Sequence, residues 1–146
     1  FLKDDLNKTS LVSNTFDFFI SLGVIEHYCD SRGMVDNLFK ITKANGEGLI
    51  SVPNIYSIHT ISRPIAQLLN KWGIGYEKSF SPKKLKTLVE KSGFKVVHFG
   101  IIPSGEMFGL LLNNIPFLGK IFIKLSYLIE THQKTWGHII YVWVKK

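Results

Sequence analysis

The run of residues 16–27, which reads FDFFISLGVIEH, limits the possible folds of this chain more than any other feature. Residues 18–22 are almost continuously apolar, as expected for a parallel β-strand that is covered on both faces. A polar turn with Gly23, Glu26 and His27 follows at once. Open α/β sheets bind ligands at the carboxyl ends of their strands. The run therefore predicts a buried strand that delivers these three residues to a ligand-binding edge.

The rest of the chain alternates helical and strand patterns, which predicts an α/β fold. We expect strands near residues 17–22, 49–52, 95–99 and 138–144, and helices near 32–42 and 82–92. The second helix has strong boundary signals, because Ser81 can cap it, Pro82 stands at its first position and Gly93 follows its end. The last strand is predicted to pair antiparallel to its predecessor.

Three further stretches accompany the opening run in a fixed order. Residues 43–54 read KANGEGLISVPN, residues 80–97 read FSPKKLKTLVEKSGFKVV, and Asp5 lies twelve residues before Asp17. Together with the opening run they resemble the motifs of class I S-adenosylmethionine (SAM)-dependent methyltransferases, in the small-molecule group with a VLEH-type motif at strand 4. The resemblance implies the carboxyl-terminal part of a Rossmann-like, doubly wound methyltransferase sheet, with strands 4, 5, 6 and 7 and helical insertions.

The family's glycine-rich cofactor turn has no counterpart here, and neither does the acidic residue that grips the ribose. We therefore interpret residues 1–146 as one incomplete methyltransferase domain, without strands 1–3. A helical insertion is predicted at about 101–137, where Pro116 should separate two helices. This insertion is open to three interpretations: a helical hairpin packed on the sheet, a lid over a substrate pocket, or an interfacial membrane helix in residues 105–130.

The charge of the chain limits its possible binding partners, and its cysteine content indicates the compartment. The net charge is +7, but it comes mainly from dispersed lysines, and Arg32 and Arg63 are the only arginines. A solvated lysine surface is therefore favoured over a nucleic-acid site, and a weak attraction to anionic membrane stays open. The single cysteine, Cys29, excludes a disulfide framework and fits a reducing, cytoplasmic compartment.

The resemblance implies S-adenosyl-L-methionine as the cofactor and assigns four residues to it. Asp5 matches the acid that meets the adenine amino group, and Leu6 the neighbour whose backbone amide meets the ring. Leu22 and Gly23 match the strand-4 residues along the methionine moiety. Asp4 is an equally good match for the adenine acid. Alternatively, Asp5 is an ordinary loop carboxylate with no contact to a cofactor.

His27 is the candidate catalytic residue. Methyl transfer mainly requires alignment of a nucleophile, and a hydroxyl acceptor benefits from a general base, for which histidine is suited. The alternative is a structural histidine that orients the loop. Glu26 is expected to cap or hydrogen-bond locally. In related ubiquinone-pathway enzymes an E-x-x-E-H turn holds a divalent ion, but Gly23 replaces the first glutamate here, so we expect no metal.

Three classes of function follow. The first is SAM-dependent methyl transfer, with O-methylation favoured, to a small or lipid-like acceptor; this chain would supply the adenine edge and the substrate side of the site. The second is a degenerate, non-catalytic domain of the same fold. The third is a peripheral, membrane-associated module built around residues 105–130.

Overall fold

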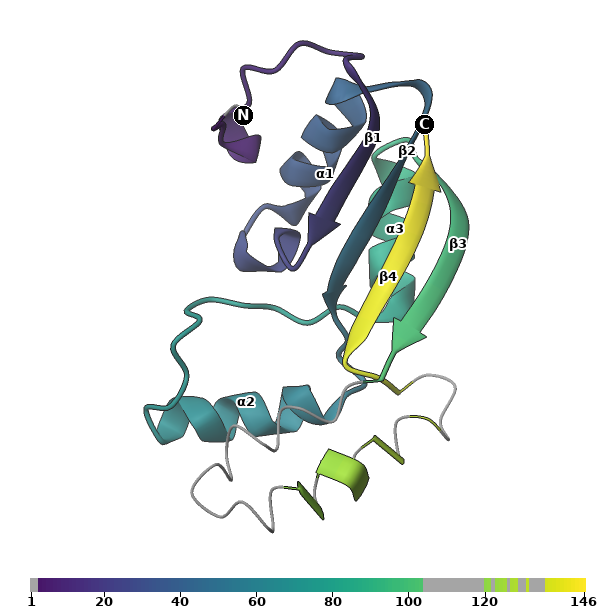
Figure 1. Cartoon of the computed structure of the whole chain (residues 1–146). Helices are drawn as coiled ribbons and strands as arrows, with labels where there is room; N and C mark the ends of the chain where they lie inside the picture. Colours follow the sequence, from purple (N-terminus) through teal and green to yellow (C-terminus); the bar gives the residue numbers. More distant parts are fainter. Residues whose placement is uncertain (1–2, 104–119, 122, 126, 129–130, 132–135) are drawn as a thin grey trace.

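Four strands form one mixed sheet in the order β1-β2-β4-β3 (Figure 1). The computed structural model describes residues 3–103, 120–121, 123–125, 127–128, 131 and 136–146. The strands are β1 (Phe16–Leu22), β2 (Thr42–Pro53), β3 (Lys95–Ile102) and β4 (Ile139–Lys145). β1 runs parallel to β2, whereas β4 runs antiparallel to both β2 and β3. The predicted α/β class and the antiparallel last strand are both confirmed.

Two helices, α1 (Ser31–Ile41) and α3 (Pro82–Lys91), pack against one face of this sheet. Both have the capping residues that the sequence leads one to expect. The Asp30 carboxylate accepts a hydrogen bond from the Gly33 amide at 2.9 Å, and the Ser81 hydroxyl accepts one from the Lys84 amide at 3.2 Å. Pro82 occupies the first position of α3, as predicted.

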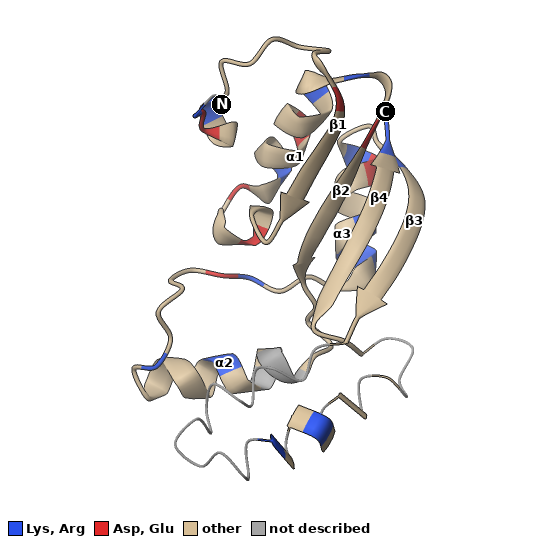
Figure 2. Ribbon diagram, viewed as in Figure 1, with Lys and Arg blue, Asp and Glu red and all other residues tan. Residues whose placement is uncertain are grey.

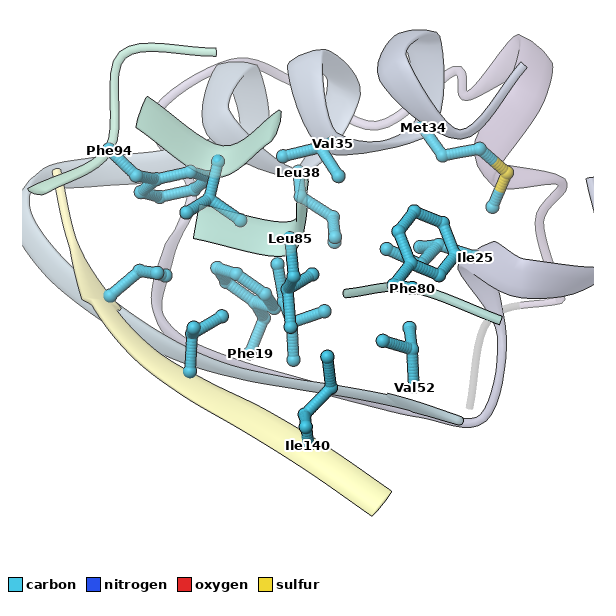
Figure 3. Close-up of a cluster of buried hydrophobic side chains, with 14 of the residues drawn as sticks. Phe19, Ile25, Met34, Val35, Leu38, Val52, Phe80, Leu85, Phe94 and Ile140 are labelled. Atoms are coloured by element: carbon cyan, nitrogen blue, oxygen red, sulfur yellow. The ribbon is translucent and has the colours of Figure 1, made fainter. Parts of the chain in front are cut away.

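The hydrophobic core lies between these helices and the sheet (Figure 3). Alternate residues of each strand point into it, while the helices contribute residues at helical spacing. The largest fully buried side chains are Phe80, Ile25, Met34, Ile50, Leu85, Ile140, Val35, Val52, Val89, Val142 and Val144. Burial of this apolar surface is the main stabilising contribution to the fold.

The opposite face of the sheet is apolar and open. Phe18, Ile20 and Leu22 of β1 are 41%, 62% and 59% exposed, although they alternate with the buried Phe19. β1 was predicted to be covered on both faces, and within the described residues that expectation is wrong. The physical reason is that α1 and α3 both lie on the other side. Figure 2 shows the charged residues of the strands gathered toward one end of the sheet, where the Glu47 carboxylate of β2 accepts a hydrogen bond from the Trp143 side chain at 2.8 Å.

A further helix, α2 (Ile58–Leu68), follows β2. It lies beyond the carboxyl end of β2 (Figure 1). The described residues between 120 and 131 are helical as well. Most of the predicted 101–137 insertion, including Pro116, falls outside the described residues. Within the described part of the chain, no helix is both long and apolar enough to cross a membrane.

Candidate functional site

The end of β1 turns sharply at Gly23. This residue has a φ of +64°, a conformation that L-residues with side chains rarely adopt. Its amide donates a hydrogen bond to the Ser51 carbonyl of β2 at 3.2 Å, which anchors the turn on the neighbouring strand. A Cβ atom at this position would lie 3.3 Å from Oε1 of Glu26. Glycine is therefore required by the backbone conformation and favoured by the close carboxylate.

His27 follows in the short 3₁₀ helix η2 (Ile25–His27). Its Nδ1 lies 2.8 Å from the backbone carbonyl oxygen of Tyr76. A carbonyl oxygen can only accept a hydrogen bond, so Nδ1 carries the hydrogen and Nε2 of the neutral ring has a free lone pair. Nε2 lies 3.9 Å from Glu26 Oε1, and the imidazole is 32% exposed. The ring is thus fixed in orientation by the Tyr76 carbonyl, and its side chain is partly exposed.

The segment that holds His27 runs from Tyr76 to Lys78 and comes after α2. The Lys78 amide donates to the Glu26 carbonyl at 3.1 Å, and its ammonium group donates to the Cys29 carbonyl at 2.9 Å. Arg63 of α2 donates to the Glu77 carbonyl at 2.9 Å. Sequence reasoning missed this segment, because it contacts the histidine loop through backbone atoms that leave no signature in residue types.

Glu26 is the most deeply buried charged group of this loop, with 2% of its surface exposed. Burial raises the pKa of its carboxyl group, and the nearby imidazole of His27 acts in the opposite direction. Its Oε2 atom has no hydrogen-bond partner in the described structure. The carboxyl group therefore lies within the loop rather than capping a helix end.

Asp5 and Leu6 lie apart from this loop. Asp5 accepts a hydrogen bond from the Asn7 amide at 2.9 Å and caps the 3₁₀ helix η1 (Leu6–Lys8). The Asn37 side chain of α1 donates to the Leu6 carbonyl at 2.7 Å, which fixes η1 beside α1. Leu22, Gly23 and His27 therefore lie at or just after the end of β1, whereas Asp5 and Leu6 belong to η1, which packs against α1.

The neighbouring Asp4 has a different environment. Its carboxylate accepts hydrogen bonds from the Thr9 hydroxyl at 2.6 Å and the Ser10 amide at 3.1 Å. The Thr9 hydrogen bond is the main reason why the pKa of Asp4 lies below its usual value. Asp4 is thus engaged in its own loop, which leaves Asp5 as the carboxylate with more capacity for a ligand.

Asn54 follows β2 and forms hydrogen bonds that stabilise the fold. It is fully buried, its amide donates to the His138 carbonyl at 2.9 Å, and its side-chain oxygen accepts from the Tyr56 amide at 3.1 Å. These bonds tie the end of β2 to the start of β4. Asn54 therefore has a structural role at the junction of β2 and β4.

An apolar groove of about 640 Å³ begins at Leu22 and runs across the open face of the sheet. Ser51, Ile139, Tyr141 and Trp143 contribute to its lining. Leu22 thus joins the Gly23 turn to this groove. Among the described residues, no group of three His, Cys, Asp or Glu side chains is placed to hold a metal ion.

Solved structures of known proteins share this architecture. The chain is similar to a SAM-dependent methyltransferase from Archaeoglobus fulgidus, with 18% identity and a TM-score of 0.64 over 99% of this chain and 66% of that one. A SAM-dependent methyltransferase from Thermotoga maritima is 17% identical, with a TM-score of 0.63 over 99% of this chain and 63% of that one. Phosphoethanolamine N-methyltransferase 2 from Haemonchus contortus, solved with S-adenosyl-L-methionine, is 14% identical, with a TM-score of 0.59 over 97% of this chain and 36% of that one.

The chain therefore has part of the Rossmann-like fold of the class I SAM-dependent methyltransferases, as the sequence motifs predicted. At these identities the similarity establishes the fold alone. The chain spans about two thirds or less of the length of these three structures. No protein-family model matches the sequence, and no curated protein matches it either.

Proposed function

We propose that this chain is the carboxyl-terminal part of a SAM-dependent methyltransferase that methylates a hydroxyl group of a small or lipid-like acceptor. The observation that carries the proposal is the state of His27. Its Nδ1 is held by the Tyr76 carbonyl, and its Nε2 is left with a free lone pair at the ligand-binding edge of the sheet. A histidine fixed in this way can take a proton from an acceptor hydroxyl.

The residues assigned to the cofactor are compatible with that role. SAM supplies a methyl group that its sulfonium already activates. Gly23 has no side chain and so leaves the backbone at the end of β1 open to a close approach. The exposed Asp5 carboxylate can accept a hydrogen bond from an amino group, in addition to the one from Asn7. Leu6 and Leu22 complete the proposed contacts, at the adenine and the methionine moiety respectively.

The domain is proposed to be completed by the strands and helices that carry the glycine-rich turn and the ribose acid. Two observations support this view. β1 stands at the edge of the sheet, and the face that contains Ile20 and Leu22 is apolar and open. The similar solved structures are longer by a third or more of their own length.

Methyl transfer by the complete domain tests the function. The domain would be incubated with SAM carrying a radiolabelled methyl group and with a panel of hydroxyl, amine and lipid-like acceptors. We expect label in a hydroxyl acceptor and transfer by a His27→Ala variant that is slower by about 10²–10⁴-fold. A complete domain that carries the glycine-rich turn but labels none of these acceptors would favour the degenerate, non-catalytic alternative.

A peripheral membrane role is the second candidate, and one observation favours it. The described helical residues near 120–128 combine exposed Ile121, Leu125 and Leu128 with the lysines Lys120 and Lys124. Flotation with anionic liposomes tests this role. Recovery with neutral and anionic liposomes alike, or with neither, would argue against a basic membrane surface.

A further inference from the structure

Glu26 is a buried carboxyl group that the proposed chemistry has not yet used. Its side chain is 3% exposed, its Oε1 lies 3.9 Å from His27 Nε2, and its Oε2 has no hydrogen-bond partner in the described structure. Buried polar atoms are normally paired, and a buried acid beside a histidine is a common sign of a functional site. The position of Glu26 therefore calls for an explanation beyond packing.

The backbone contacts around Glu26 hold its carboxyl group close to the histidine. The Glu26 carbonyl accepts the Lys78 amide at 3.1 Å, and the absence of a side chain at Gly23 leaves space for Oε1. The same Tyr76–Lys78 segment binds the imidazole through the Tyr76 carbonyl. Glu26 and His27 are thus held by one segment and keep a fixed relative orientation.

Other charged groups near Glu26 are already engaged. Glu77 adds a negative charge that acts to raise the pKa of Glu26, but it is itself paired with Arg63 at 3.4 Å. The Lys78 ammonium group donates to the Cys29 carbonyl. Among the described residues, His27 is the one group that forms an ion-pair contact with Glu26.

We infer that Glu26 is a positioning residue for the proposed base, and that its carboxylate stabilises the His27 imidazolium formed during methyl transfer. The separation of 3.9 Å is longer than a hydrogen bond, so Nε2 keeps its lone pair for the acceptor, while the carboxylate is close enough to act through its charge. This inference rests on the proposed function.

Methyl transfer to a hydroxyl moves one proton to His27 and one methyl group to the acceptor oxygen. The proton of the acceptor hydroxyl moves to Nε2 of His27, and the electron pair of the O–H bond stays on the oxygen. A C–O bond then forms to the methyl carbon as the C–S bond breaks and leaves its electron pair on sulfur. The imidazole gains one positive charge in this step, and the Glu26 carboxylate offsets it.

A kinetic comparison in the complete domain tests the role. Glu26→Gln keeps the shape of the side chain and removes its charge, and Asp36→Asn removes an exposed carboxylate that pairs with Arg32 on α1. We expect Glu26→Gln to lower kcat by about 10–100-fold, by analogy with the carboxylates that support metal-binding histidines, with KM unchanged. Asp36→Asn should leave kcat unchanged.

The pH profile separates a charge effect from a structural one. The ratio of wild-type to Glu26→Gln kcat should fall toward one in acid, because the wild-type carboxyl group is then protonated too. A ratio that does not change with pH, or full kcat in the Gln variant at neutral pH, would overturn the inference.

A titration of Glu26 itself is independent of methyl transfer. The ¹³C signal of its carboxyl carbon, followed by NMR in the complete domain, should titrate above the ordinary glutamate range. His27→Gln should raise that midpoint further, because the imidazole normally lowers the pKa of Glu26. A midpoint that His27→Gln leaves in place would refute the coupling. If the coupling is present and no methyl transfer occurs, the proposed function fails rather than the pairing.

Discussion

Nδ1 of His27 lies 2.8 Å from the carbonyl oxygen of Tyr76, a residue 49 positions further along the chain. This contact fixes the tautomer of the ring and leaves Nε2, which lies 3.9 Å from Glu26 Oε1, with its lone pair. It also makes the segment after α2 part of the site. A histidine that is held by a backbone carbonyl and keeps a lone pair on its second nitrogen is suited to general base catalysis.

The first prediction concerns His27 in the complete domain. His27→Ala should lower the turnover rate by roughly 10²–10⁴-fold, because the variant lacks the imidazole that is proposed to take the acceptor proton. His27→Gln should be almost as slow, since an amide can donate to the Tyr76 carbonyl but cannot accept the proton. SAM affinity should change little in either variant. Substantial activity in His27→Gln would show that the ring only orients the loop, and loss of cofactor binding in both variants would show a structural role.

The second prediction concerns the pH dependence of stability. Burial raises the pKa of Glu26 in the folded chain, so folding favours its protonated form. The contribution of Glu26 to stability is therefore fully present below the ordinary glutamate pKa and is lost as pH rises through the raised folded value. Glu26→Gln should be more stable than wild type at neutral pH, with the difference vanishing in acid.

Urea denaturation at a series of pH values measures this difference. Asp17→Asn is the matched control, because the pKa of Asp17 is shifted in the opposite direction: the hydrogen bond and charge of Lys43 lower it. Its contribution is present above the ordinary aspartate pKa and is lost as pH falls. Asp17→Asn should therefore not stabilise the chain at neutral pH. Equal stabilisation by both variants would point to a general effect of removing negative charge.

The third prediction concerns the end of α3. Gly93 has a φ of +102°, and a Cβ atom there would lie 2.8 Å from the Phe39 ring. Gly93→Ala should therefore lower the free energy of unfolding by about 1–3 kcal/mol. Gly73 has open space around its Cβ position, so Gly73→Ala should change stability by less than about 0.5 kcal/mol. Similar melting temperatures for the two variants would contradict the described end of α3.

The fourth prediction concerns the open face of the sheet. An uncovered apolar face beside a free strand edge favours association, so this chain alone should be oligomeric or poorly soluble. Ile20→Lys should reduce the association in sedimentation velocity. Val12→Lys, at a valine outside the sheet that is even more exposed than Ile20, should not. A wild-type chain that is monomeric and melts cooperatively would be inconsistent with an incomplete domain.

Local signals in the sequence predicted most of the fold. The cap at Ser81, the proline at position 82 and the glycine at position 93 define α3 within a residue of its observed bounds. β2 begins earlier than predicted, at Thr42. The reason is pairing with the end of the chain, because the Asn45 amide binds the Lys146 carbonyl and the Lys146 amide binds the Gly46 carbonyl. Such pairing depends on residues a hundred positions apart, which a local pattern does not contain.

The candidate site was also predictable only where local sequence signals define it. The motif placed Gly23, Glu26 and His27 at the end of a strand, and they lie there. The Tyr76 contact was not predictable, because it uses a backbone carbonyl. The burial of Glu26 was not predictable either, because an acid in a polar turn is ordinarily exposed. Both features arise from how the segment after α2 returns to the loop after β1.

Calorimetric titration of SAM tests the central claim most directly. This chain carries the proposed adenine and methionine contacts at Asp5, Leu6, Leu22 and Gly23, and the glycine-rich turn and ribose acid are proposed to lie in the rest of the domain. We predict no measurable binding by residues 1–146 alone and a micromolar isotherm for the complete domain. A micromolar isotherm for this chain alone, or none for the complete domain, would contradict the account.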